Sequence, residues 1–206
     1  YHDIILKMAS FNKPMIVATG ASKIEEVNFL MRKLEKLNEN VVLMQCNTNY
    51  TAEAENFKYI QLNVLKTYAS LFPKAILGLS DHTLGHSTVL GAVALGAKVI
   101  EKHFTDDNNL IGPDHKFSMN PTTWKNMVDA TSELEYALGT PTKKIEDNEQ
   151  ETSILQRRCL RVSKNLKKDE IITDEMIEIL RPAPKDAILP FEIEKVIGMK
   201  LKNNKE

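Results

Sequence analysis

The first part of the chain alternates short β-branched runs with longer helical patterns, and this alternation constrains the fold more than any other feature. Such alternation is typical of strands and helices that build a parallel sheet. Four units of this kind make half of a (β/α)₈ barrel or a small doubly wound α/β sheet, and periodicity alone does not separate the two. The predicted strands cover residues 15–18, 41–45, 75–79 and 98–102.

The segments between these strands carry helical spacing of apolar residues. Ser22 is the predicted N-cap of the first helix, because Glu25 follows three residues later and completes a capping box. The second helix is predicted as one continuous element over residues 56–71. Two further helices are predicted over residues 87–95 and 120–138.

The character of the sequence changes near residue 140. Residues 140–156 are polar and charged, which is the composition of a linker. Short apolar stretches broken by charged and proline-rich segments follow, and they predict a small loop-rich β domain over 157–206. The expected organisation is therefore a domain over 1–139, a linker and a second, smaller domain.

Charge and cysteine content exclude several classes of partner. The chain holds 27 basic and 28 acidic residues and has a net charge of −1, so we expect neither nucleic acid nor an anionic membrane as a partner. No apolar run approaches the length of a bilayer span, and no signal peptide opens the chain. Cys46 and Cys159 lie far apart without a partner motif, which predicts a reducing, cytoplasmic location.

Two histidines follow consecutive predicted strands, His82 in G-L-S-D-H-T-L-G and His103 in V-I-E-K-H-F-T. The carboxyl ends of barrel strands share one rim, so both imidazoles can reach one metal ion there. The alternative is that each histidine is a hydrogen-bonded polar residue at a strand end. Carboxylates at Asp81, Glu101 and Asp114 lie close in sequence, and this donor mixture suits Mn²⁺ or Mg²⁺ better than a thiolate-bound zinc.

The loop G-P-D-H-K at residues 112–116 is the third chemical signal. Its Gly-Pro turn presents Asp114 together with His115 and Lys116 as a dense acid-base cluster. Turns of this type are common, so a charged surface loop remains the alternative. Its place soon after His103 makes it a candidate wall of the same site.

These motifs together resemble the sialic acid synthase family. The matching segments are I-V-A-T-G-A-S, L-M-Q-C-N-T-N-Y, G-L-S-D-H-T-L-G, G-A-K-V-I-E-K-H-F-T, G-P-D-H-K-F-S and the R-P pair at 181, and they span essentially the whole chain. The resemblance implies the C-terminal half of a TIM barrel, strands five to eight, followed by an antifreeze-like (SAF, β-clip) domain. It also implies that the chain is truncated at both ends.

The resemblance implies a transferase of sialic acid biosynthesis that condenses phosphoenolpyruvate with N-acetylmannosamine or a related N-acylated amino sugar and releases phosphate. It implies a divalent metal, Mn²⁺ or Mg²⁺, and a domain-swapped homodimer. The isolated fragment is expected to be inactive. The sequence leaves the amino sugar open.

Roles carry over to individual residues by the same resemblance. His82 and His103 would ligate the metal, and Asp114 would hold a metal-bound water. Arg181 would reach from the antifreeze-like domain into the partner's barrel to bind the amino sugar. The residues expected to contact substrate in the barrel are Ser80, Thr48, Asn49 and Tyr50.

Three features depart from the family pattern. Ala18 stands where the family often has serine, and Tyr50 precedes Thr51 where a tyrosine-proline pair is common. The first half of the barrel, with its phosphate-binding lysines and acidic base, is absent from this sequence. Two alternatives therefore remain. One is another metal-dependent barrel aldolase or 3-deoxy sugar acid synthase, which leaves Arg181 unexplained, and the other is an inactive fragment or sugar-binding relic.

Overall fold

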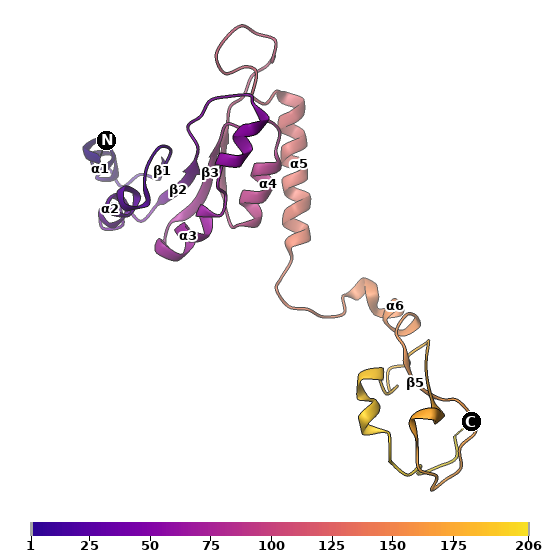
Figure 1. Ribbon diagram of the computed structural model, residues 1–206. Coiled ribbons are helices and arrows are strands. Elements are labelled where there is room, and N and C mark those ends of the chain that lie inside the picture. The colour runs from indigo at the N-terminus through magenta and orange to yellow at the C-terminus, as the bar shows by residue number, and fades with distance from the viewer. Residues whose placement is uncertain (1, 206) are drawn as a thin grey trace. The chain divides into compact units, whose positions relative to one another are not determined.

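The structure is a computed structural model that describes residues 2–205, and it divides into two compact units, up to Thr140 and from Pro141 onward (Figure 1). Each unit is described by itself. Among the described residues, no helix is both long and apolar enough to cross a membrane.

The first unit is built on a four-stranded sheet in which every strand is parallel to its neighbours. The strands lie in the order in which they occur along the chain, without a crossover. This order confirms the predicted half barrel and excludes the order reversal of a doubly wound sheet. The strands are β1 (Met15–Ala18), β2 (Val41–Cys46), β3 (Ile76–Asp81) and β4 (Val99–Lys102).

Helices follow or separate the strands, as the alternation predicts, and one more helix, α1, precedes the first strand. They are α1 (His2–Ala9), α2 (Ile24–Leu34), the 3₁₀ helix η1 (Ala54–Tyr59), α3 (Val64–Leu71), α4 (Ser87–Ala94) and α5 (Pro121–Leu138). The start of α5 matches its sequence signals, because the Asn120 side chain accepts the Thr123 N–H and Pro121 occupies the first turn.

The start of α2 differs from the prediction by one residue. Lys23 is the N-cap instead of Ser22, and the Lys23 N–H donates to the Glu26 carboxylate at 2.8 Å. Ala21 has a positive φ of 53°, so the turn after β1 uses one more residue before the helix begins. Glu25 and Glu26 are adjacent, and the sequence does not show which of them closes the capping box.

The predicted continuous helix over residues 56–71 is wrong, because the chain breaks between η1 and α3. The buried Gln45 side chain of β2 donates to the Ile60 carbonyl at 2.9 Å, which takes that carbonyl out of a helical ladder. Gln61 then adopts a positive φ of 53°, and α3 starts at Val64. A tertiary contact therefore overrides a helical pattern here.

The core of this unit lies between the sheet and its helices. Side chains that alternate along the strands, such as Val17, Leu43 and Leu79, are buried against residues of α2, α3 and α4. Burying a side chain of this size stabilises the fold by roughly 1.5–3 kcal/mol. On the opposite face the exposure varies along the strands, since Ile16 is 59% and Ile76 46% exposed while Met44 is fully buried. That face corresponds to the inside of a barrel.

The second unit is small and has few regular elements. They are η2 (Asp147–Glu149), α6 (Gln150–Leu155), β5 (Cys159–Val162), η3 (Asp174–Met176), β6 (Ile177–Leu180) and η4 (Pro190–Lys195). β5 and β6 pair antiparallel. Its buried residues are Cys159, Leu166, Ile172, Ala183 and Val196. The segment predicted as a linker contains η2 and α6.

Candidate metal and substrate site

His82 and His103 lie side by side at the carboxyl-end rim of the sheet. Each follows the last residue of its strand, and those last residues, Asp81 and Lys102, are direct cross-strand partners. The two ring centroids are 5.1 Å apart with an interplanar angle of 60°. The fold therefore brings the two predicted metal ligands together.

The orientation of the His82 ring is set by a backbone group. Its Nδ1 lies 2.8 Å from the Asn47 carbonyl oxygen, in the loop after β2. A carbonyl can only accept a hydrogen bond, so Nδ1 carries a proton, and in the neutral imidazole Nε2 then keeps its lone pair. This is the arrangement in which a histidine ligates a metal through one nitrogen while the other is held by its surroundings.

The loop between β4 and α5 brings Asp114 to the second histidine. Asp114 Oδ2 lies 3.6 Å from His103 Nδ1, which is too long for a hydrogen bond but places the carboxylate beside the ring. The Asp114 side chain is partly exposed. The predicted acid-base loop thus borders the histidine pair, and Thr105 Oγ1 engages His115 Nδ1 at 2.8 Å within it.

Two aromatic rings enclose the histidine pair. The Tyr50 ring centroid lies 4.2 Å from that of His82 and 5.6 Å from that of His103. The Phe117 ring centroid lies 5.0 Å from that of His103, and Phe117 is buried. Phe117 was not among the predicted site residues, although it follows the G-P-D-H-K loop directly, and an aromatic residue beside a polar loop is the signal that pointed to it.

The donor set fits a divalent metal with an open coordination sphere. Among residues 2–205, no group of three or more His, Cys, Asp and Glu side chains is arranged to hold a metal ion by itself. The chain offers two imidazoles, with the Asp114 carboxylate beside one of them. Two nitrogens leave several positions for water and substrate oxygens, as Mn²⁺ or Mg²⁺ catalysis requires.

A polar row crosses the open face of the sheet close to the histidines. Cys46, Ser80 and Glu101 are successive cross-strand partners on β2, β3 and β4. Ser80 Oγ donates to Glu101 Oε1 at 3.1 Å. Burial raises the pKa of the Cys46 thiol, which keeps it protonated and unsuited to act as a nucleophile. Ser80 supplies the hydroxyl of this row and is itself buried.

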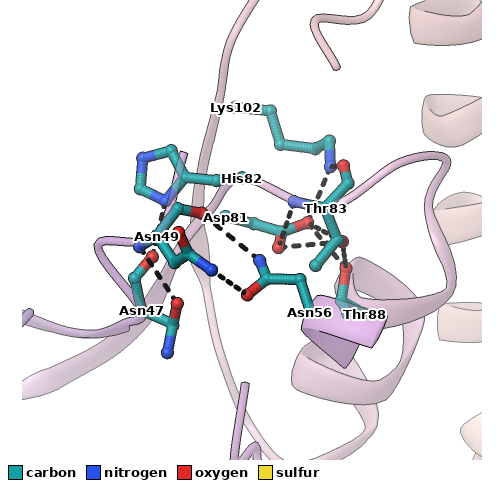
Figure 2. A network of polar contacts seen from close by, with 8 residues as sticks. All are labelled: Asn47, Asn49, Asn56, Asp81, His82, Thr83, Thr88 and Lys102. Atoms are coloured by element: carbon teal, nitrogen blue, oxygen red, sulfur yellow. Dashed lines mark hydrogen bonds and ion pairs between the residues drawn. The ribbon is translucent and has the colours of Figure 1, made fainter. Parts of the chain in front are cut away.

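Two residues of the loop after β2, Thr48 and Asn49, are predicted to contact substrate, and their surroundings in the structure differ. The Asn49 side chain donates to Asn56 Oδ1 at 3.3 Å, and Asn56 Nδ2 donates back to the Asn49 carbonyl at 3.3 Å (Figure 2). Asn49 is therefore occupied in holding the loop. Thr48 is exposed, and its methyl group packs directly on Gly20. A Cβ added to Gly20 would lie 2.2 Å from that methyl carbon.

Asp81 does not serve as a donor beside the histidines. Its carboxylate contacts Lys102 Nζ at 2.6 Å, and the two side chains are 0% and 1% exposed. Thr83 and Thr88 complete this buried network, which Figure 2 shows beside His82. Sequence reasoning missed it, although both motifs, D-H and K-H, place a charged residue directly before a histidine.

Arg181 belongs to the second unit and is exposed directly after β6. The segment that carries it is anchored, because an Arg161 guanidinium nitrogen donates to the Pro182 carbonyl at 2.9 Å and Cys159 Sγ contacts the same oxygen at 3.3 Å. The exposed Arg181 side chain therefore extends from a backbone segment that these hydrogen bonds hold in place.

Comparison with known proteins assigns both units. Residues 1–143 match the NeuB family and residues 157–206 match the SAF domain. The N,N'-diacetyllegionaminic acid synthase of Legionella pneumophila is 37% identical over 201 residues, which are 95% of this chain and 55% of that protein. The human N-acetylneuraminate-9-phosphate synthase is 29% identical over 195 residues, 95% of this chain and 53% of that protein.

A solved structure gives the same answer. The crystal structure of the Bacillus subtilis spore coat polysaccharide biosynthesis protein SpsE has a TM-score of 0.60 and 32% identity, over 99% of this chain and 61% of that one. The chain thus spans little more than half the length of these relatives. With the NeuB match over most of its length and the SAF match beyond it, the chain belongs to the NeuB family of sialic acid synthases.

Proposed function

We propose that this chain supplies the metal site and the sugar-binding arm of a nonulosonic acid synthase, which condenses phosphoenolpyruvate with an N-acylated amino sugar and releases phosphate. The observation that carries the proposal is the His82–His103 pair with Asp114 beside it on one rim. The legionaminic and N-acetylneuraminate-9-phosphate synthases among its relatives support the product class. The buried free cysteines fit a reducing cytoplasm.

His82 and His103 would hold the divalent cation through ring nitrogens, with the His82 proton kept on Nδ1 by the Asn47 carbonyl. The cation would supply a Lewis acid for the open-chain aldehyde of the sugar. Asp114 would orient a water molecule beside the cation. Tyr50 and Phe117 pack on the two imidazoles and reduce access of bulk water.

The balance of bonds follows ordinary chemistry. C3 of phosphoenolpyruvate forms the new bond to the aldehyde carbon, and a water oxygen adds to C2. The C2–O bond to phosphate then breaks, and the keto acid and inorganic phosphate remain. Ser80 and Thr48 are the hydroxyl groups that we assign to phosphoenolpyruvate, with Asn49 holding the loop that presents Thr48.

The activity belongs to a protein with both halves of the barrel. The relatives hold considerable chain that has no counterpart here, so the groups that bind phosphate and act as base are assigned to no residue of this chain. We propose a domain-swapped homodimer, in which Arg181 of one subunit binds the sugar in the other.

The function is tested by supplying substrates to the natural gene product that contains these 206 residues. Phosphate release and product mass are measured with phosphoenolpyruvate, Mn²⁺ and either N-acetylmannosamine or a 2,4-diacetamido sugar. We expect a product whose mass equals sugar plus pyruvate with one of them, and none after chelation of the metal. Turnover only with aldose phosphates that lack an acylamino group would instead indicate a 3-deoxy sugar acid synthase, and no turnover with any acceptor would indicate a binding relic.

Replacing Arg181 with Ala is expected to raise the KM for the amino sugar roughly 10- to 100-fold, because charge-assisted hydrogen bonds contribute about 1.5–3 kcal/mol. The KM for phosphoenolpyruvate should change little, since the arginine contacts one substrate only. Lys185→Ala is the control, because Lys185 is an exposed cation of the same unit. Equal small effects on both constants would make Arg181 an ordinary surface charge.

A further inference from the structure

The buried network behind the two histidines uses every oxygen of one carboxylate. Asp81 Oδ2 accepts from Lys102 Nζ at 2.6 Å and from Thr88 Oγ1 at 2.6 Å. Asp81 Oδ1 accepts the Thr83 N–H at 3.1 Å, and Thr83 Oγ1 lies 3.0 Å from both carboxylate oxygens. Since Thr88 lies on α4, the network joins β3, β4 and that helix (Figure 2).

The same network clamps the backbone on both sides of His82. Lys102 Nζ also donates to the Thr83 carbonyl at 2.7 Å. Asp81 precedes His82 and Thr83 follows it, so hydrogen bonds hold the residues before and after this histidine. Lys102 precedes His103, so the residue whose ammonium group bonds the backbone next to His82 is also the chain neighbour of His103.

The ring of His82 is held from the other direction. Its Nδ1 bonds to the Asn47 carbonyl, and the Asn47 side-chain oxygen accepts the Asn49 N–H at 3.1 Å. Asn49 is locked in turn by Asn56, which is buried. The backbone is clamped behind and the ring is bonded in front, and these contacts together fix the position of Nε2.

Stability alone does not account for this arrangement. A buried ion pair loses solvation, and replacing such a pair with apolar residues is often neutral or stabilising. Positioning of the two histidines explains the pair better. Neighbouring residues in a strand point to opposite faces, so the charged partners point away from the histidines that follow them.

We propose that Asp81 and Lys102 are positioning residues for the metal site: with Thr83 and Thr88 they set the separation of the His82 and His103 rings, so that tight binding of a divalent cation requires the intact pair. This inference rests on the proposed metal site and deepens it. Its signature is a loss of metal affinity that the loss of stability does not explain.

The test is Mn²⁺ affinity, measured by electron paramagnetic resonance on the natural gene product without substrates. Thr88→Val removes one donor to Asp81 with almost no change of shape, and we expect about tenfold weaker Mn²⁺ binding. The double variant Asp81→Asn with Lys102→Met removes both charges without leaving either one alone, and we expect roughly 100-fold weaker binding. Thermal unfolding midpoints are recorded for every variant.

The matched control is Asn38→Ala. Asn38 is buried, donates to the Lys13 carbonyl at 2.7 Å and accepts the Asn40 N–H, at the opposite, amino-end rim of the sheet. It should lower stability and leave Mn²⁺ affinity within about twofold of the parent, well short of the change expected at the site. Folded Thr88→Val and double variants that also bind Mn²⁺ within twofold would overturn the positioning role. A parent protein that binds no Mn²⁺ would overturn the metal site itself, and the inference with it.

Discussion

Replacing Lys102 alone with Met is expected to lower the free energy of unfolding of the first unit by about 3–5 kcal/mol. The reason is that Asp81 would remain as a buried carboxylate without its cation, since both side chains are almost fully inaccessible. The loss can be measured by urea denaturation. Trp124, the single tryptophan of the chain, lies in α5 of the first unit and packs on Phe104, so its fluorescence reports this unit.

Lys125→Met is the matched control for this substitution. Lys125 pairs with Asp129 on the exposed surface of α5, and exposed pairs at this spacing contribute only about 0.3–0.5 kcal/mol. Asp81→Leu combined with Lys102→Met should recover part of the lost stability, because no unpaired charge remains and Thr83 Oγ1 and Thr88 Oγ1 already lie 2.9 Å apart and can satisfy each other. The Thr83 N–H and carbonyl lose these partners, so recovery is incomplete. Equal losses for Lys102→Met and Lys125→Met would show that the buried pair contributes nothing beyond an ordinary surface pair.

Replacing His82 with Ala is expected to weaken Mn²⁺ binding by more than about 100-fold, because losing a ligand costs more than the roughly 10- to 100-fold typical of an outer-shell partner. The effect should appear in electron paramagnetic resonance titrations and, in the complete enzyme, as turnover that no practical Mn²⁺ concentration restores. His103→Ala should behave in the same way, since the two ring centroids lie only 5.1 Å apart.

His86→Ala controls for the loss of an imidazole from the same segment. His86 stands at the N-cap of α4, four residues after His82, and its side chain makes no capping hydrogen bond. We expect Mn²⁺ affinity close to that of the parent. If His82→Ala binds Mn²⁺ as tightly as His86→Ala does, the metal site lies elsewhere.

Local sequence signals were sufficient where one element decides its own structure. Apolar periodicity placed four strands and the helix α5, and the cap and proline at its start agree with the structure. The two histidines could be paired from their motifs alone, because residues that end consecutive parallel strands of a barrel must share a rim. Asp81 and Lys102 are direct cross-strand partners, so the histidines that follow them leave their strands at the same level of the sheet.

The same signals failed where a distant side chain decides. The break between η1 and α3 depends on Gln45, which reaches the Ile60 carbonyl from a strand that is separate in sequence. The one-residue shift of the α2 cap depends on the turn at Ala21, since Glu25 and Glu26 are chemically equal candidates. Neither the Gln45 contact nor the turn at Ala21 can be recognised from the helical spacing of apolar residues.

The sequence by itself therefore determined the order of strands, the family and the pair of histidines, because these follow from local periodicity and short motifs. Only the tertiary structure decided what Asp81 does: it lies within a motif that suggests a metal-binding carboxylate, yet it pairs with Lys102 behind the site. The physical reason is that a strand directs successive side chains to opposite faces, while cross-strand register and burial decide which charges meet.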